Sequence, residues 1–186
     1  MKLLITGNPD KGLAKSLCNI WPDARFVSRS TGWDLNDDAR LSDLAKLALE
    51  FDVFINNSAL WRYRQSLLVH DVYAEAKRVD HPLRIVCIGS TTDRTRKASD
   101  WLYQQEKIAL RNMCNSLGLL SVWAGGPKVS MISFGTLSNN QHKHPDRNCM
   151  AMDEAAQYVK WMIDQPLHLS INELSIDPVQ EKNRVK

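Results

Sequence analysis

Residues 83–107 read LRIVCIGSTTDRTRKASDWLYQQEK and carry the pattern from which both fold and chemistry are inferred. An almost wholly apolar run leads to Ser90, which predicts a strand buried on both faces. Tyr103 and Lys107 lie four positions apart, so on a helix they share one face. The apolar positions that continue this face are Leu110, Cys114 and Leu117. The face is therefore expected to point toward the sheet. Ser99 or Asp100 can cap this helix, which is expected to end near Gly118.

A Tyr and a Lys that point into a protein are costly unless they serve a chemical purpose. A free phenol has a pKa of about 10 and is a poor base at neutral pH. A neighbouring ammonium lowers that pKa, and a Ser hydroxyl can hold a substrate oxygen beside the phenol. Ser90, Tyr103 and Lys107 are therefore predicted to move a proton to or from an alcohol oxygen. Because Tyr-x-x-x-Lys often occurs by chance, this prediction depends on the rest of the chain.

Length and composition are those of a globular domain. The chain has 186 residues, of which 44% are hydrophobic and 24% charged. We expect a single domain over residues 1–179, followed by a polar tail over residues 180–186. The net charge is +3 and the basic residues are dispersed, which disfavours a nucleic-acid partner. No apolar run approaches the length of a membrane span, so no membrane partner is expected either.

The cysteines and the N-terminus predict a cytoplasmic protein. Four cysteines lie far apart in the sequence, which is typical of buried thiols in a reducing compartment and not of a disulfide framework. The first apolar run gives way to Gly7 and is too short for a signal peptide. His142, His144 and Cys149 lie in a long polar stretch over residues 137–149, and no metal site is expected there.

Strand-like and helix-like segments alternate along the chain. The expected strands are residues 2–6, 24–27, 52–55, 83–90, 128–133 and 169–176. This order predicts an α/β fold, a Rossmann-like doubly wound parallel sheet of about six strands with helices on both faces. Ligands bind such sheets at the carboxyl ends of the strands. The polar or glycine positions expected at those ends are Gly7, Arg29, Asn56, Ser90 and Gly135.

Two of these strand ends have the character of a dinucleotide site. Residues 6–14 read TGNPDKGLA, a glycine-containing turn between a strand and a helix, and such a turn can cradle a phosphate. An ordinary tight turn explains the same letters. Arg29 follows the second strand, where a ribose 2′-phosphate would be met, and therefore favours NADP over NAD. The alternative is a solvated loop arginine.

Taken together, these segments resemble the short-chain dehydrogenase/reductase family, as a shortened member. Residues 6–14 resemble its Thr-Gly-x-x-x-Gly-x-Gly turn, with one extra residue and Ala14 in place of the last glycine. Residues 56–59 resemble its Asn-Asn-Ala-Gly signature with the last two positions altered. Ser90, Tyr103 and Lys107 match its catalytic residues at the usual spacing. Further matches are Asp34 and Leu35 to its adenine-contacting pair, residues 132–136 to its Pro-Gly segment with Phe134 for proline, and residues 172–178 to its closing strand.

The resemblance implies an NADP(H)-dependent oxidoreductase that moves hydride between the nicotinamide and a small carbonyl or alcohol substrate. It implies that Tyr103 exchanges the proton, that Lys107 lowers its pKa and holds the nicotinamide ribose, and that Ser90 orients the substrate oxygen. It also implies a homodimer or homotetramer. The implied cofactor-binding residues are Gly7, Asn8, Lys11, Gly12, Leu13, Arg29, Ser30, Asp34, Leu35, Asn57, Ser58, Ala59, Tyr103, Lys107 and Gly135. The expected substrate pocket is lined by Trp61, Tyr63, Thr91, Ala98, Phe134 and residues 137–149.

Two departures leave alternatives open. The family often places a catalytic Asn in the helix before the serine strand, whereas residues 60–89 contain no Asn. Arg29 and Asp34 are only five positions apart, so one strand-helix unit and one edge strand are expected to be missing. A non-catalytic NADP(H)-binding sensor or scaffold is the alternative function. An epimerase or an enzyme acting on a nucleotide sugar is a third, although such chains usually need a larger C-terminal substrate domain.

Overall fold

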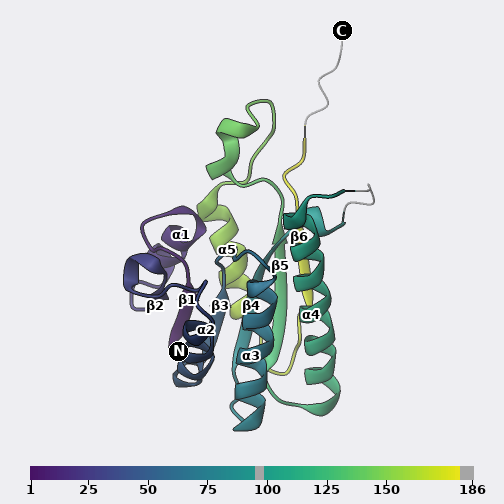
Figure 1. Cartoon of the computed structure of the whole chain (residues 1–186). Helices are drawn as coiled ribbons and strands as arrows, with labels where there is room; N and C mark the ends of the chain where they lie inside the picture. The colour runs from purple at the N-terminus through teal and green to yellow at the C-terminus, as the bar shows by residue number, and fades with distance from the viewer. Residues whose placement is uncertain (95–98, 181–186) are drawn as a thin grey trace.

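Six parallel strands form one sheet in a computed structural model that describes residues 1–94 and 99–180 (Figure 1). The strands, in sheet order, are β2 (Arg25–Val27), β1 (Leu3–Thr6), β3 (Val53–Asn56), β4 (Arg84–Ser90), β5 (Lys128–Phe134) and β6 (Glu173–Ile176). Every neighbouring pair is parallel, so all carboxyl ends lie along one edge of the sheet. The prediction of a doubly wound parallel sheet is confirmed.

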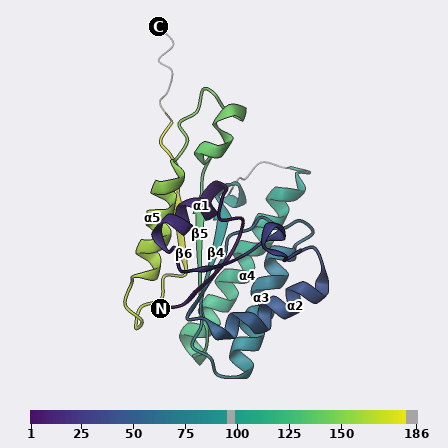
Figure 2. The same cartoon turned by 90° about the vertical axis from the view of Figure 1, so that its left-hand side faces the viewer.

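Helices cover both faces of the sheet (Figures 1 and 2). Helices α1 (Gly12–Ile20) and α5 (Met152–Ile163) pack together on one face. Helices α2 (Asp38–Leu47), α3 (Arg64–Arg78) and α4 (Leu102–Ala124) lie side by side on the other. This arrangement is the one that alternating parallel strands and helices dictate, because each crossover returns to the same edge of the sheet.

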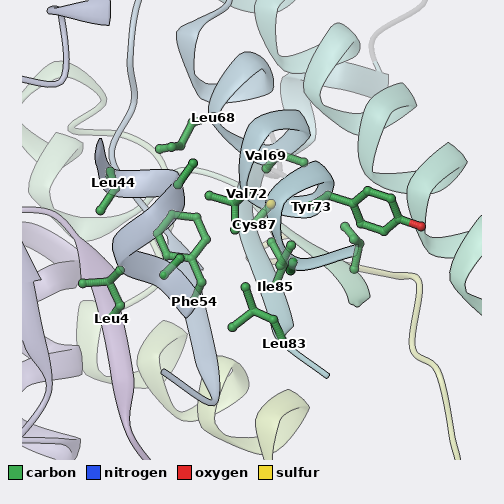
Figure 3. Packing of buried hydrophobic residues seen from close by; sticks show 14 of the residues in the cluster. Leu4, Leu44, Phe54, Leu68, Val69, Val72, Tyr73, Leu83, Ile85 and Cys87 are labelled. Atoms are coloured by element: carbon green, nitrogen blue, oxygen red, sulfur yellow. The ribbon is translucent and has the colours of Figure 1, made fainter. Parts of the chain in front are cut away.

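Two hydrophobic cores result from the alternation of side chains along the strands. Leu4, Phe54 and Ile85 face helices α2, α3 and α4, and Figure 3 shows Phe54 packed among Leu44 and Leu68. The adjacent residues in the same strands face α1 and α5; they are Leu3, Ile5, Val53, Ile55 and Val86. Both sets are almost fully excluded from solvent, which is why these strands lack a polar alternation in the sequence.

The connection between β2 and α2 is short. Residues 28–37 hold only the 3₁₀ turn η1 (Arg29–Thr31) and loop, and β2 is the last strand on that side of the sheet. The expected loss of one strand-helix unit agrees with this arrangement. Helix α2 begins after Asp37, whose carboxylate caps it by accepting a hydrogen bond from the Ala39 N–H at 2.9 Å.

Helix α4 differs from its predicted limits at both ends. It begins at Leu102 with Trp101 as the N-cap, while the predicted cap Ser99 accepts a hydrogen bond from the Trp101 N–H. It continues to Ala124, past Gly118, where the sequence predicted its end. A Cβ at Gly118 would lie 2.9 Å from the carbonyl oxygen of Val129 on β5. This glycine therefore permits close packing of helix on strand and does not terminate the helix.

Three smaller expectations need correction or completion. Strand β6 covers only Glu173–Ile176 of the predicted residues 169–176. Cys87 and Cys114 are buried free thiols, but Cys18 and Cys149 are half-buried, so the expectation of buried thiols is right for two of the four. Ala98, and residues 181–186 of the predicted tail, lie outside the described residues. None of the helices within residues 1–94 and 99–180 has the length and apolarity needed to cross a bilayer.

Candidate active site

An open groove of about 710 Å³ lies at the carboxyl ends of β1, β2 and β3. Every cofactor residue that the sequence predicted between Gly7 and Ala59 lines it: Gly7, Asn8, Lys11, Gly12, Leu13, Arg29, Ser30, Asp34, Leu35, Asn57, Ser58 and Ala59. The groove thus brings together residues from the three segments that follow β1, β2 and β3. Trp33, which was not predicted, also lines it, as does Asn139 from residues 137–149, which were expected to line the substrate pocket.

The floor of the groove is a glycine turn that admits no side chain. Gly7 has φ of +141°, and a Cβ there would lie 2.7 Å from Asn57 Nδ2 and 2.9 Å from Ala14 Cβ. Asn57 Nδ2 donates to the Thr6 carbonyl at 2.9 Å, and Thr6 Oγ1 accepts from the Asn57 N–H at 2.8 Å. These bonds tie the end of β3 to the end of β1. Above them α1 begins without a side-chain cap, which leaves its first-turn N–H groups suited to an anion.

The turn η1 presents Arg29 at the rim of the same groove. Its backbone is fixed because the Ser28 N–H donates to Thr31 Oγ1 at 2.8 Å, while the Ser28 and Ser30 hydroxyls are 2.8 Å apart. Arg29 is exposed, and no carboxylate in residues 1–94 or 99–180 lies within ion-pair distance of it. A guanidinium without an acidic partner, flanked by two hydroxyls, is suited to a phosphate.

Ser90, Tyr103 and Lys107 come together at the end of β4. Ser90 is the last residue of the strand, and its hydroxyl accepts from Thr92 Oγ1 at 3.0 Å. The ammonium of Lys107 lies 5.4 Å from the centre of the Tyr103 ring. The Ser90 hydroxyl lies near enough to the Tyr103 hydroxyl to act to lower the pKa of the phenol. The three side chains therefore lie near one another, as the helical spacing of Tyr103 and Lys107 and the position of Ser90 at a strand end predicted.

The pKa of Tyr103 is displaced in the direction opposite to the prediction. Burial raises it above the ordinary value of 10, the Asp93 carboxylate raises it further, and the Ser90 hydroxyl only partly opposes them. Burial of the phenol is the main reason, and the Lys107 ammonium, which lies against the ring and donates to two other acceptors, does not offset it. Burial also lowers the pKa of Lys107 to about 8. The net displacement of the Tyr103 pKa in the free protein is therefore upward, whereas the sequence had led us to expect a lowered value.

Lys107 is held by a side chain that the sequence analysis did not single out. Its Nζ donates to Gln65 Oε1 at 2.7 Å and to the Ile88 carbonyl at 3.3 Å. Gln65 lies in the first turn of α3 and is buried. The only available signal was a glutamine next to the apolar stripe of that helix, which is too common to identify a site.

A second, much smaller cavity of about 60 Å³ lies beside the Tyr103 ring, Gln65, Glu106 and Lys107. It shares Ala59, Leu60 and Trp61 with the large groove, so the two cavities adjoin. The rings of Trp61 and Trp101 flank Tyr103, with centroids 6.4 Å and 5.0 Å from that of Tyr103. Trp61 and Tyr63 thus occupy the pocket wall where the sequence analysis placed them.

Some predicted residues lie elsewhere. Gly135 lines neither cavity; its N–H donates to the Ile176 carbonyl at 2.9 Å, and a Cβ there would lie 2.8 Å from Pro178 Cδ. Phe134 is buried in the core, and Thr91 Oγ1 donates to Asp177 Oδ1 at 2.6 Å. Of residues 137–149, only Asn139 reaches the groove. In the described part of the chain, no three His, Cys, Asp or Glu side chains gather as a metal site.

Comparison with known proteins identifies the fold class. No family model and no curated protein matches the sequence. A serine dehydrogenase complexed with NADP+ matches with a TM-score of 0.75 at 15% identity, over 100% of this chain and 98% of that chain. BdcA in complex with NADPH matches with a TM-score of 0.75 at 16% identity, over 100% and 97%. A short chain dehydrogenase from Burkholderia cenocepacia J2315 in complex with NADP matches with a TM-score of 0.74 at 15% identity, over 93% and 86%. This protein therefore has the fold of the short-chain dehydrogenases.

Proposed function

We propose that this protein is an NADP(H)-dependent oxidoreductase that interconverts a small carbonyl compound and its alcohol. The observation that carries the proposal is that the two cavities adjoin. The groove lined by Gly7 and Arg29 shares Ala59, Leu60 and Trp61 with the cavity beside Tyr103. A cofactor bound along the groove would therefore end beside a phenol and an ammonium, which is the arrangement that hydride transfer coupled to proton transfer requires.

The residues of the groove fit NADP. The turn at Gly7 packs so closely on Asn57 and Ala14 that it leaves no room for a Cβ, and the uncapped start of α1 beside it offers N–H donors to a pyrophosphate. Arg29, with Ser28 and Ser30 beside it, would hold the 2′-phosphate, and Asp34 would contact the adenosine. The solved structures of the same fold that contain NADP+ or NADPH support this cofactor.

In the proposed mechanism the bound NADPH supplies the hydride. Tyr103, whose phenol is protonated at neutral pH because its pKa is raised above 10, donates its proton to the carbonyl oxygen. Ser90 donates a hydrogen bond to the same oxygen and orients it. The Lys107 ammonium stabilises the phenolate that remains after the proton has left.

The test is reduction of a panel of small aldehydes and ketones, followed as loss of NADPH absorbance, with calorimetry of nucleotide binding alongside. Turnover that requires Tyr103 supports the proposal. Tight binding of NADPH without turnover of any carbonyl would favour a nucleotide-binding sensor or scaffold. Failure to bind either NADPH or NADH would overturn both functions.

A further inference from the structure

The ammonium of Lys107 is buried among neutral partners. The residue is 5% exposed, and its Nζ donates to Gln65 Oε1 and the Ile88 carbonyl. No carboxylate within residues 1–94 and 99–180 lies within 4.0 Å of this nitrogen. A buried charge without a counter-ion is stabilised mainly by the dipoles that touch it. The two oxygens that accept from Lys107 are therefore what keeps it in place.

The amide of Gln65 is itself held in one orientation. Its Nε2 donates to the carbonyls of Asn56 and Ile88, at 3.1 Å each, so the amide spans the ends of the neighbouring strands β3 and β4. Asn56 Nδ2 donates a hydrogen bond to the main-chain carbonyl of Gln65 at 3.0 Å. Both amide protons are used, so Oε1 is the atom left to face Lys107. If the amide were flipped, its NH₂ group would face the Lys107 ammonium, and its oxygen would face the carbonyl oxygens of Asn56 and Ile88.

We infer that Gln65 is the residue that positions Lys107 beside Tyr103 for the proton transfer of the proposed reaction, an inference that rests on the proposed function. The acceptor is an amide and not a carboxylate. It orients the ammonium without neutralising it, so the positive charge remains available to the phenolate.

The low pKa of Lys107, about 8, agrees with an uncompensated buried ammonium. The titratable groups that face it come from three elements: Tyr103, Glu106 and Cys114 on α4, Cys87 on β4, and Asp93 in the turn η3 (Thr91–Arg94). The carboxylates of Glu106 and Asp93 raise this pKa, but burial outweighs them. A change confined to Gln65 leaves all these groups in place.

The competing interpretation is that Gln65 only joins β3 to β4, with Lys107 as a bystander. The titration of Lys107 itself distinguishes the two interpretations. It is followed as the ¹³Cε chemical shift in protein with labelled lysine. The Lys107 signal is assigned as the one that is absent from Lys107→Met. Gln65→Met keeps the length of the side chain and removes the acceptor. Gln65→Glu keeps an acceptor and adds a charge. Gln104→Met is the matched control, because Gln104 is buried and donates to the Thr92 carbonyl but makes no hydrogen bond to Lys107.

Without its acceptor the charged form of Lys107 is disfavoured, so Gln65→Met should move the titration midpoint below that of the wild type, by about tenfold or more in the acid dissociation constant. Gln65→Glu should move it above the wild type, and Gln104→Met should leave it unchanged. With a carbonyl substrate in hand, Gln65→Met should also shift the pH profile of kcat in the same direction.

Identical midpoints in the wild type and Gln65→Met would overturn the inference. If Gln65→Met does not fold, two other measurements decide. A Lys107 midpoint in Gln65→Glu equal to that of the wild type would contradict the inference. So would the absence, in the wild type, of a nuclear Overhauser contact between the Lys107 ε-protons and the Gln65 amide protons. The titration needs no turnover. An inactive protein in which Gln65 still controls Lys107 would refute the proposed function and leave this contact standing.

Discussion

The side-chain carboxylate of Glu106 accepts a hydrogen bond from the backbone N–H of Tyr63 at 3.2 Å and so ties α4 to the loop that precedes α3. The same oxygen accepts from the Arg62 N–H. Arg62 and Tyr63 both have φ of +59°, a left-handed conformation that costs a non-glycine residue roughly 1–2 kcal/mol. A buried carboxylate on the helix that carries Tyr103 and Lys107 thus holds the strained wall of the pocket.

Removal of this carboxylate should loosen the wall. Glu106→Ala leaves two N–H groups without their acceptor and should lower the free energy of unfolding by about 2 kcal/mol. It should also speed amide exchange at Arg62 and Tyr63. Glu106→Gln retains an acceptor oxygen, so its free energy of unfolding should fall by less. Glu75→Ala breaks only a surface pair with Arg78 and serves as the control. Unchanged exchange at Arg62 and Tyr63 in Glu106→Ala would contradict this role.

Arg29 should decide the choice between the two nucleotides. Arg29→Asp replaces the proposed 2′-phosphate contact with a like charge, so NADPH affinity should fall about 100-fold while NADH affinity is kept or improved. Arg25→Asp makes the same change of charge on an exposed residue of β2 outside the groove. Calorimetry with both nucleotides measures the ratio of NADPH affinity to NADH affinity in each variant. A ratio that moves equally in both variants would reflect general charge and not a specific contact.

The buried ammonium should make stability rise with pH. The pKa of Lys107 is about 8 in the folded protein and about 10.4 when unfolded, so between these values the unfolded chain binds more protons. The free energy of unfolding should therefore increase as the pH rises from 8 toward 10, by about 2 kcal/mol from this group. Urea titrations of the wild type and of Lys107→Met at each pH measure it. An equal slope in Lys107→Met would assign the effect to other groups.

Substitution of Gly118 by alanine should destabilise the protein, although this substitution usually stabilises a helix. Alanine in a helix interior is favoured over glycine by about 1 kcal/mol. Here the added Cβ would lie 2.9 Å from the Val129 carbonyl, so Gly118→Ala should destabilise the protein by about 1–3 kcal/mol. Ser116→Ala, at an exposed position of the same helix, is the control. A rise in melting temperature for Gly118→Ala would contradict the close packing.

Much of this architecture could be predicted from the sequence because strand and helix patterns are local. The run ending at Ser90 and the spacing of Tyr103 and Lys107 record burial and helical periodicity, and those properties survive in the fold. Gly118 misled the prediction because a glycine serves both helix ends and close packing, and only the position of β5 distinguishes the two uses.

The pKa of Tyr103 and the partner of Lys107 could not be predicted in the same way. Both depend on contacts distant in sequence, since Gln65 lies 42 positions from Lys107 and the burial of the phenol arises from several elements. Gly135 follows a strand end as expected, yet its close contact with Pro178 explains it without a ligand.

The most direct test of the proton donor is the activity of Tyr103→Phe. The phenyl ring preserves packing against Trp61 and Trp101, and removes only the hydroxyl. We expect kcat for carbonyl reduction at pH 7 to fall by about 10²–10⁴-fold, with the dissociation constant for NADPH within about threefold of the wild type. Full activity in Tyr103→Phe would contradict the account.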